Sequence, residues 1–457
     1  MPTKGLVQPK ENCFLILKSY WPFNGMVKLY KDEYLINLSF ILFVIYPYAM
    51  KRLIIINCSI YLLLAFPFLS LTAGVSTADS TLKSSIDSLA AIHLDKTQGI
   101  GFVIGINEEG IERVFYYGSS QKKPESIADS GSLYELGPLS ATFTSILFSD
   151  MALKGEIGYD DPIQKYLPFD VLSPVYQKII CKPLKDAGVS IGLQTDPSMR
   201  FTPYVCLPDI NSTPQPILLC YLATHTSGLP DFPYNVRSLT GETTIYQNYS
   251  KENLYDFLKD FRLVEPISYD YNYSELGVAL LGHIISLRKD SAFDSILSKR
   301  IFQPLGMNSS SFIRKEDSQN KLLTGYTASL KIAKRRQYDL FAPAGGLNST
   351  ISDMMKFLDA NLGNTNPAFK NVLDYTHNPR ILLTDNDSKD IEIAMGWKIR
   401  RINDEGAKAI WQGGSTEGFA SFIAFEEIKK RGVVILSNSS VSVEALGFEV
   451  LKLIEKP

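Results

Sequence analysis

A serine and a lysine three residues apart are the smallest set of side chains in this sequence that could carry out nucleophilic catalysis. On a helix the two lie on one face, so the lysine amine can take the proton of a serine that attacks a carbonyl carbon. The pattern occurs at Ser80–Lys83, Ser119–Lys122 and Ser286–Lys289. Such pairs are common by chance, and none of the three stands in a sequence typical of an active site. The serine–lysine pattern alone therefore identifies no nucleophile.

Another stretch has the pattern of a catalytic helix without its chemistry. It is "LYELGPLSATFTSILFSDMALKG" at 133–155, in which apolar residues recur at helical spacing and Lys154 with Gly155 provide a C-terminal stop. Pro138 falls at the first helical position, where a missing backbone N–H is tolerated. The stretch predicts a helix that begins at Pro138.

Five further stretches accompany this helix in a fixed order. They are "LATHTSGLPDFP" (222–233), "YSELGVALLGHII" (273–285), "IFQPLGMNSSSF" (301–312), "PAGGLNSTISDMMKFL" (343–358), and "AMGWKI" through "WQGGSTEGFASFIAFEEIKKRGVVILSN" (394–438). With these motifs the chain resembles the serine β-lactamase and penicillin-binding-protein superfamily over nearly everything after residue 84. The closest branch is the class C β-lactamases with their esterase and DD-peptidase relatives.

The resemblance implies three catalytic motifs, and each is altered here. The family pattern is S-x-x-K on the helix, Y-x-N in the helical subdomain and K-T-G on a strand edge. The matching positions are Pro138 and Ala141, then Tyr273 and Glu275, then Gln412, Gly413 and Gly414 followed by Ser415. Only the tyrosine is kept, so the nucleophile, the base, the amide-binding asparagine and the cation that binds a carboxylate are all replaced.

Four residues near these motifs have two interpretations each. Ser140 is a weak alternative nucleophile, although it points about 200° away from Pro138 around the helix. Tyr273 is either a residual acid/base or a packing residue at the start of a helix, and Glu275 is either a ligand contact or a solvated charge. His225, in "THTSGL", invites a catalytic-triad interpretation, but in the family this segment is a structural turn.

The elements that must position these residues follow from the hydrophobic pattern and from the resemblance. Strand-like runs near residues 99–118 and 419–437 bracket a mostly helical middle. We therefore expect an α/β (α+β sandwich) fold, with an antiparallel sheet flanked by helices plus an all-α subdomain, in the β-lactamase/transpeptidase style. Residues 169–216 are Pro- and Ser-rich and form an insertion in the domain at 84–457. Cys181 and Cys206, which bracket part of it, form either a disulfide or two separate thiols.

The first 78 residues differ from the rest of the chain. Lys51 and Arg52 precede an uncharged apolar run that ends in small residues before Asp79, which is the pattern of a cleaved signal peptide at 50–78. Residues 1–49 then form an upstream extension that is not part of the natural protein. A second apolar stretch, 35–49, leaves an uncleaved membrane anchor as the alternative. We expect an exported protein, periplasmic or secreted, that meets a membrane only through this segment.

Composition excludes several classes of protein. The chain has 457 residues, 45% of them hydrophobic, and a formal net charge of −2, so nothing indicates nucleic-acid binding. Its four histidines and five cysteines show no metal-ligand spacing, so we expect no metal and no cofactor. The sequence does not define an oligomeric state.

Three functions are consistent with these features. The first is a catalytically degenerate β-lactamase-related protein, or pseudoenzyme, whose former cleft binds a peptidoglycan-like ligand, a small acyl ligand or a protein partner. The second is an active hydrolase of esterase, D-alanyl-D-alanine peptidase or β-lactamase type, which uses substitute groups such as Ser140, Tyr273 or Glu275. The third is a membrane-tethered structural protein.

Overall fold

The computed structural model describes residues 77–122, 126–183, 204–238, 246–268, 270–312, 321–383, 391–402 and 406–454. By its contacts the chain divides into two units, Met1–Gly74 and Val75–Pro457, and all described residues belong to the second. The predicted extension at 1–49 and the greater part of the predicted signal or anchor at 50–78 lie outside the described residues. Among the helices that are described, none is long and apolar enough to span a membrane.

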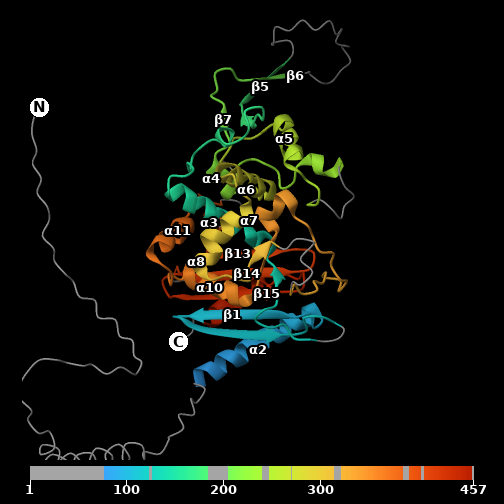
Figure 1. The fold of residues 1–457 in the computed structure, drawn as a ribbon, viewed down its shortest axis with the longest axis vertical. Coiled ribbons are helices and arrows are strands. Elements are labelled where there is room, and N and C mark those ends of the chain that lie inside the picture. Colours follow the sequence, from blue (N-terminus) through green and yellow to red (C-terminus); the bar gives the residue numbers. More distant parts are fainter. Residues whose placement is uncertain are drawn as a thin grey trace, which may run out of the picture. The chain divides into compact units, whose positions relative to one another are not determined.

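An eight-stranded antiparallel sheet is the centre of the described domain (Figure 1). Its order across the sheet is β10-β11-β12-β13-β14-β15-β1-β2. The strands are β10 (Ile381–Leu382), β11 (Ile391–Ile393), β12 (Lys398–Arg401), β13 (Lys408–Ser415), β14 (Ala420–Glu426), β15 (Arg431–Ser437), β1 (Phe102–Glu108) and β2 (Ile111–Tyr117). The first and last strands of the described chain, β1 and β15, are therefore neighbours in one antiparallel sheet.

Alternation along β1 shows why the sheet is covered on both faces. Phe102, Ile104 and Ile106 face one hydrophobic core, while Val103 faces the other, because successive side chains of a strand point to opposite sides. The hairpin to β2 turns at Glu109 and Gly110, both with positive φ, and Asn107 Oδ1 accepts a hydrogen bond from the Gly110 N–H at 3.0 Å. The sequence "NEEG" at 107–110 is typical of such a hairpin turn.

Helices form a layer on each side of the sheet (Figure 1). On one face α2 packs against α12, which contacts β14 and β15; on the other face α10 contacts β1 and β15. Beyond α10 lies the helical part, where α3 packs against α6, α9 and α11. The helices are α2 (Thr77–Thr97), α3 (Ser140–Leu153), α4 (Leu219–Ala223), α5 (Lys251–Asp260), α6 (Glu275–Lys289), α7 (Phe293–Leu297), α8 (Gln303–Leu305), α9 (Ala342–Gly345), α10 (Ile351–Asn361), α11 (Pro367–His377) and α12 (Glu444–Leu453).

Shorter elements complete the described fold. A small sheet has the order β3-β9-β8, and two two-stranded sheets pair β4 with β7 and β5 with β6. The strands are β3 (Tyr134–Glu135), β9 (Leu347–Ser349), β8 (Ser311–Phe312), β4 (Val175–Tyr176), β7 (Gln215–Pro216), β5 (Ile179–Pro183) and β6 (Tyr204–Pro208). The short 3-10 helices are η1 (Gly137–Leu139), η2 (Ile163–Lys165), η4 (Tyr234–Ser238) and η6 (Asp339–Phe341), and a π-helical turn covers Ser298–Phe302.

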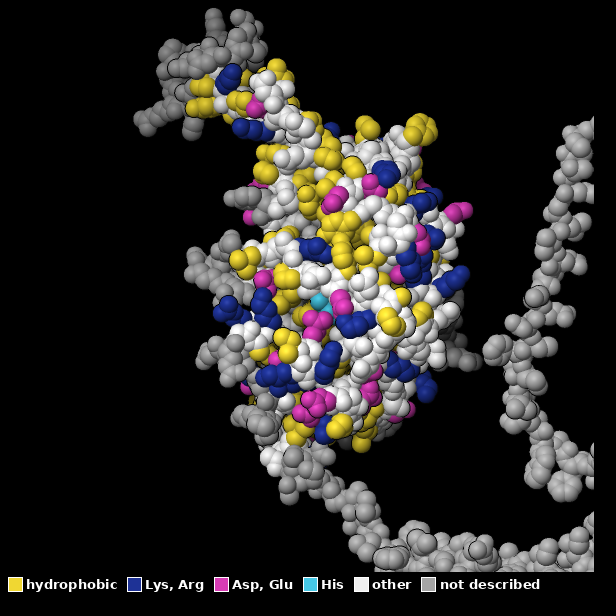
Figure 2. Space-filling view, turned by 90° about the vertical axis from the view of Figure 1, so that its left-hand side faces the viewer, with side chains coloured by type: hydrophobic (Ala, Val, Ile, Leu, Met, Phe, Trp, Pro, Cys, Tyr) yellow, Lys and Arg dark blue, Asp and Glu magenta, His cyan; other side chains and the backbone are white. Residues whose placement is uncertain are grey.

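The predicted insertion at 169–216 contains both of these two-stranded sheets, β4–β7 and β5–β6. Cys181 and Cys206 are paired opposite one another on β5 and β6 and are joined by a disulfide. Large apolar side chains of this segment are exposed, among them Phe169 at 97% and Ile210 at 93%. Figure 2 shows hydrophobic side chains gathered toward the helical end of the molecule, while positive and negative side chains are interspersed over the rest of that face.

Candidate active site

The predicted catalytic helix forms where the sequence places it. A 3-10 turn at Gly137–Leu139 has Pro138 in its first positions and continues directly into α3. Proline is tolerated there because the first N–H groups of a helix have no partner within it. Gly137 has φ +54° and lies against Thr416, so a glycine is required at this turn. The start of the helix thus keeps its shape without a serine.

Ala141, at the position of the base, lies in an apolar contact. Its methyl group packs against Val278 of α6 and Ala344 of α9, and the residue is 1% exposed. The position that holds a lysine in the family is therefore part of a contact between three apolar side chains, and none of the three can accept a proton.

Ser140 is buried in the fold and does not face the former nucleophile position. Its hydroxyl donates to the Gly137 carbonyl at 2.7 Å and accepts from the Leu347 N–H at 3.1 Å. The residue is 1% exposed, and both bonds stabilise the junction between η1 and β9. The structure thus contradicts the weak prediction that Ser140 is a substitute nucleophile, because its buried hydroxyl is hydrogen-bonded to two backbone groups.

Tyr273 and Glu275 lie at the N-terminus of α6, where Ser274 is the N-cap. The Ser274 hydroxyl accepts from the Gly277 N–H at 2.9 Å and donates to the Pro230 carbonyl at 2.7 Å. Among the described residues, neither the Tyr273 hydroxyl nor Glu275 Oε2 has a hydrogen-bond partner, although both atoms are buried. Glu275 is 8% exposed, so its interpretation as a solvated charge is wrong.

Burial shifts the protonation of both groups. It raises the pKa of Glu275 to about 7, and the nearby Asp231 carboxylate adds to this shift while a hydrogen bond with Tyr246 opposes it. Burial also raises the pKa of Tyr273 well above its usual value, and the charge of Glu275 adds to this effect. Tyr273 is therefore a neutral phenol at neutral pH, whereas Glu275 is close to half-protonated.

His225 has a structural environment. Its backbone has φ +56°, its Nδ1 accepts from the Ser274 N–H at 3.2 Å, and its ring lies 4.6 Å from that of Tyr273. Burial lowers the pKa of His225 to about 4, and the positive charge of Lys398 adds to this shift. The imidazole is neutral at physiological pH and positions Tyr273, in agreement with the structural interpretation.

The third motif lies on β13, directly beside the start of α3. A Cβ at Gly414 would lie 2.7 Å from the Leu136 carbonyl oxygen and 2.9 Å from Pro138 Cδ, so only glycine permits this approach. Gln412 turns its side chain inward: its Nε2 donates to the Gly396 carbonyl at 3.4 Å, and its Oε1 accepts from the Gly413 N–H at 3.1 Å. Ser415 ends the strand and is exposed. The strand edge is in place, but its cation is absent.

Arg336 is a cation near this edge that the sequence analysis did not identify. Its guanidinium lies over the Tyr246 ring at 4.9 Å from the centroid and donates to Glu417 Oε1 at 3.1 Å. Glu417 lies three residues after Gly414, so Arg336 approaches the region of the third motif from another element. The segment "KRRQYD" has no period or motif that would indicate this role.

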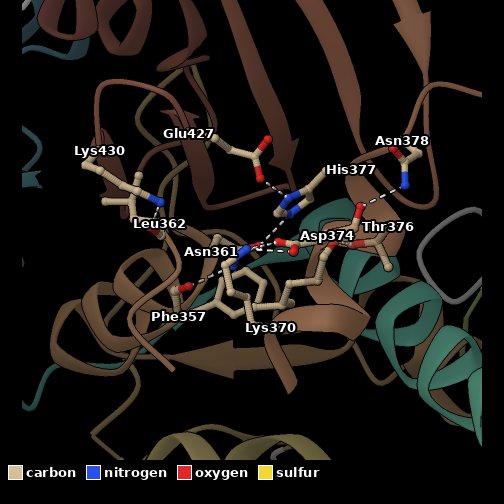
Figure 3. A network of polar contacts seen from close by, with 11 residues as sticks. Phe357, Asn361, Leu362, Lys370, Asp374, Thr376, His377, Asn378, Glu427 and Lys430 are labelled. Atoms are coloured by element: carbon tan, nitrogen blue, oxygen red, sulfur yellow. Dashed lines mark hydrogen bonds and ion pairs between the residues drawn. The ribbon is translucent and has the colours of Figure 1, made fainter. Parts of the chain in front are cut away.

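A second cluster of polar residues lies on the outer side of α11 (Figure 3). Ligand atoms of Asp374, His377 and Glu427 lie within 4.8 Å of one another. Each already has a protein partner: His377 Nδ1 meets Glu427 at 2.7 Å and its Nε2 meets Asn361 Oδ1 at 2.9 Å, while Asp374 pairs with Lys370 at 2.6 Å. We assign the cluster a structural role, because it joins α11 to the turn between β14 and β15.

A pocket of about 450 Å³ opens between α6, α7 and the segment 335–340. Glu135 and Asn348, from the small β3–β9 sheet, line its buried end. The replaced catalytic positions lie outside its lining. The sequence does not indicate this pocket, because its lining residues come from segments with no common motif.

Comparison of the fold defines the class of protein. A class C β-lactamase structure superposes with a TM-score of 0.64 at 20% identity, covering 83% of this chain and 97% of that one. A structure described as a D-alanine carboxypeptidase from Burkholderia cenocepacia gives 0.63 at 21% identity, covering 82% and 99%. These likenesses establish the fold alone: the described domain has the fold of the class C β-lactamases.

Sequence comparison then gives the family. The Beta-lactamase family model matches residues 86–451. The β-lactamase of Psychrobacter immobilis is 22% identical over 416 residues, covering 84% of this chain and 90% of that protein. The β-lactamase of Escherichia coli is 23% identical over 369 residues, covering 74% and 84%. The chain belongs to the β-lactamase family, and the predicted superfamily membership and fold class are confirmed.

Proposed function

We propose that this protein is a non-catalytic member of the β-lactamase family, whose former cleft binds a peptidoglycan-like peptide without acyl transfer. The observation that carries the proposal is the apolar contact of Ala141 with Val278 and Ala344 beside Pro138. A proline has no nucleophilic atom, and it also lacks the N–H that the resemblance assigns to the oxyanion hole. Loss of a nucleophile costs on the order of 10⁶ in turnover, and loss of one oxyanion donor about 10²–10³.

Two unpartnered atoms support a binding role for the cleft. Buried polar atoms are nearly always hydrogen-bonded, yet Glu275 Oε2 and the Tyr273 hydroxyl have no partner among the described residues. A peptide amide could donate to Glu275, and a peptide carbonyl could accept from Tyr273. Both bonds suit a peptidoglycan-like ligand better than an apolar one.

Covalent labelling tests the loss of acyl transfer. The full chain is incubated with a fluorescent penicillin or a fluorophosphonate, and an active class C β-lactamase serves as the positive control. We expect no label on this protein after denaturation, because no nucleophile stands at Pro138. Label that survives denaturation would contradict the proposal.

A second candidate is a hydrolase that uses Tyr273 and Glu275. The observation in its favour is the pKa of about 7 for Glu275, since carboxyl groups perturbed in this way are common in active sites. Purified protein would then turn over nitrocefin or a p-nitrophenyl ester, and Tyr273→Phe would abolish the turnover. Absence of turnover with both substrate classes would contradict this candidate.

We also propose that the protein is exported, either periplasmic or secreted. The signal pattern at 50–78 and the joined Cys181 and Cys206 support this, because disulfides persist in oxidising compartments. N-terminal sequencing of the natural protein tests it, with a start near Asp79 as the expected result. A retained N-terminus would favour the membrane-tethered alternative.

A further inference from the structure

The pocket of about 450 Å³ has a buried end that is rich in hydrogen-bond acceptors. Glu135 and Asn348, which line this end, are 8% and 6% exposed. They lie directly opposite one another on the paired strands β3 and β9, and residues so placed carry their side chains on the same face of a sheet. The carboxyl and the amide group therefore face the same space.

The amide of Asn348 is fixed by one hydrogen bond and unsatisfied at its other end. Its Nδ2 donates to the Gly346 carbonyl at 3.1 Å. Because this bond sets the orientation of the amide, Oδ1 is directed away from Gly346, and this buried oxygen has no donor among the described residues. Natural proteins seldom leave such an acceptor unpaired, which indicates that a donor from outside the chain occupies the position.

Glu135 adds a charge at the same end. Burial raises the pKa of this carboxyl, a hydrogen bond from Thr416 opposes the shift, and the positive charges of Arg336 and Arg335 oppose it further. Arg336 also lines the pocket, and its bond to Glu417, which is not part of the lining, partly compensates its charge. A cation that entered the pocket would stabilise the ionised form of Glu135.

The walls between the buried end and the solvent are aromatic. Phe293 of α7, Phe312 of β8 and Tyr338 line the pocket, together with the half-buried Asp294 and the exposed Arg335. The volume falls within the range of about 300–1,000 Å³ typical of small-ligand sites. Such walls suit a carbon chain that extends outward from a buried polar group.

We propose that this pocket binds a small primary amine, whose ammonium group donates to the Glu135 carboxylate and to Asn348 Oδ1 while its carbon chain packs against Phe293, Phe312 and Tyr338. An ammonium group carries three donors and no acceptor, which complements two adjacent acceptors. The site is independent of the proposed loss of acyl transfer, since the positions altered in the catalytic motifs do not line it. Covalent labelling and amine binding can therefore fail separately.

Calorimetric titration of the full chain tests the proposal with three probes of one chain length: n-pentylamine, 1-pentanol and pentanoate. We expect saturable binding of one molecule of pentylamine, with 1-pentanol at least about tenfold weaker. Equal binding of the alcohol would overturn the role of the ammonium group. Preference for pentanoate would overturn it as well and would assign the pocket to anions at Arg335. No binding of pentylamine up to about 10 mM would also overturn the proposal.

Variants test the two acceptors separately. Glu135→Gln and Asn348→Leu should each weaken pentylamine binding at least about tenfold, whereas Asp294→Asn should change it less than about threefold. Circular dichroism tests whether each variant is folded. If Glu135→Gln does not fold, the affinity of Asn348→Leu for pentylamine and the comparison of the three probes still test the proposal. An unchanged affinity in a folded Asn348→Leu protein would contradict the proposed contact.

Discussion

Pro138 decides more about this protein than any other single residue, because it alters a nucleophile and a backbone donor at the same position. Because Ala141, on the next turn of the helix, replaces the base, a serine at position 138 would not by itself restore the catalytic pair. We expect Pro138→Ser to fold and to remain inactive, since a serine without a nearby base stays protonated. Nitrocefin turnover measures this, with the unaltered chain as the reference. Substantial turnover by Pro138→Ser would show that another group serves as the base.

Ser140 offers a test of the structural role assigned to its hydroxyl. Ser140→Ala removes a donor to the Gly137 carbonyl and leaves the buried Leu347 N–H without its acceptor. We expect the free energy of unfolding to fall by about 1–3 kcal/mol. Ser415→Ala, at an exposed position on β13, should change it by less than about 0.5 kcal/mol. Denaturant unfolding of both variants provides the measurement, and equal effects would contradict the assignment.

Glu275 makes stability depend on pH. Its pKa rises from an ordinary value of 4.5 to about 7 on folding, so the folded state binds this proton more tightly than the unfolded chain does. The contribution of this carboxyl is therefore fully present below about pH 4.5 and is lost as the pH rises through about 7. Between about pH 5 and about pH 8 the loss amounts to roughly 1–3 kcal/mol.

The variant Glu275→Gln should not show this loss. As the pH is raised from about 5 to about 8, the variant should therefore become more stable relative to the unaltered chain, which means that its free energy of unfolding increases relative to that of the unaltered chain. Glu449→Gln, at an exposed position on α12, is the matched control and should show no such trend. A parallel pH dependence in all three proteins would mean that Glu275 does not titrate in this range.

At the scale of elements, the link between α11 and the turn after β14 depends on His377. Both of its ring nitrogens face acceptors, Glu427 and Asn361, and the Asn361 amide is oriented by its own bond to the Phe357 carbonyl at 2.7 Å. His377 thus connects a helix to a sheet turn (Figure 3).

Removal of this connector should cost more than removal of its exposed neighbour. We expect His377→Ala to lower the free energy of unfolding by about 1–3 kcal/mol, because buried Asn361 loses its partner. Lys370→Ala breaks only the exposed pair with Asp374 and should cost less than about 1 kcal/mol. Thermal and denaturant unfolding measure both. A larger effect for Lys370→Ala would contradict the assignment.

The elements that the sequence predicts are those with a strong local pattern. The helix after Pro138, the hairpin at Glu109 and Gly110 and the buried strand β15 all follow from periodicity and turn residues. His377 and Glu427 were not predicted as partners, because 50 residues separate them and only the fold brings them together. The pairing of Glu135 with Asn348 cannot be predicted from the sequence either, since β3 and β9 are too short to show an alternating hydrophobic pattern.

At the scale of the whole molecule, the alterations are confined to the chemistry. The glycines at 137 and 414 that allow β13 to approach the helix are retained, while the groups that would react are replaced. The sequence established this contrast through six ordered motifs. It gave no information on Arg336, whose segment has no regular pattern and whose position depends on contacts with Tyr246 and Glu417.

The pairing of β1 with β15 has a consequence for how the chain folds. Ser437 at the end of β15 bonds to the Gly101 carbonyl, across a separation of 336 residues. Contacts between such distant parts of a chain slow folding, because the intervening loop must close first. During synthesis β1 emerges before β15, and the edge of β1 that pairs with β15 stays unpaired until β15 has been made. A ribosome that stops before Arg431 therefore releases a chain in which β1 has an unpaired edge, which can pair with the edge of another chain.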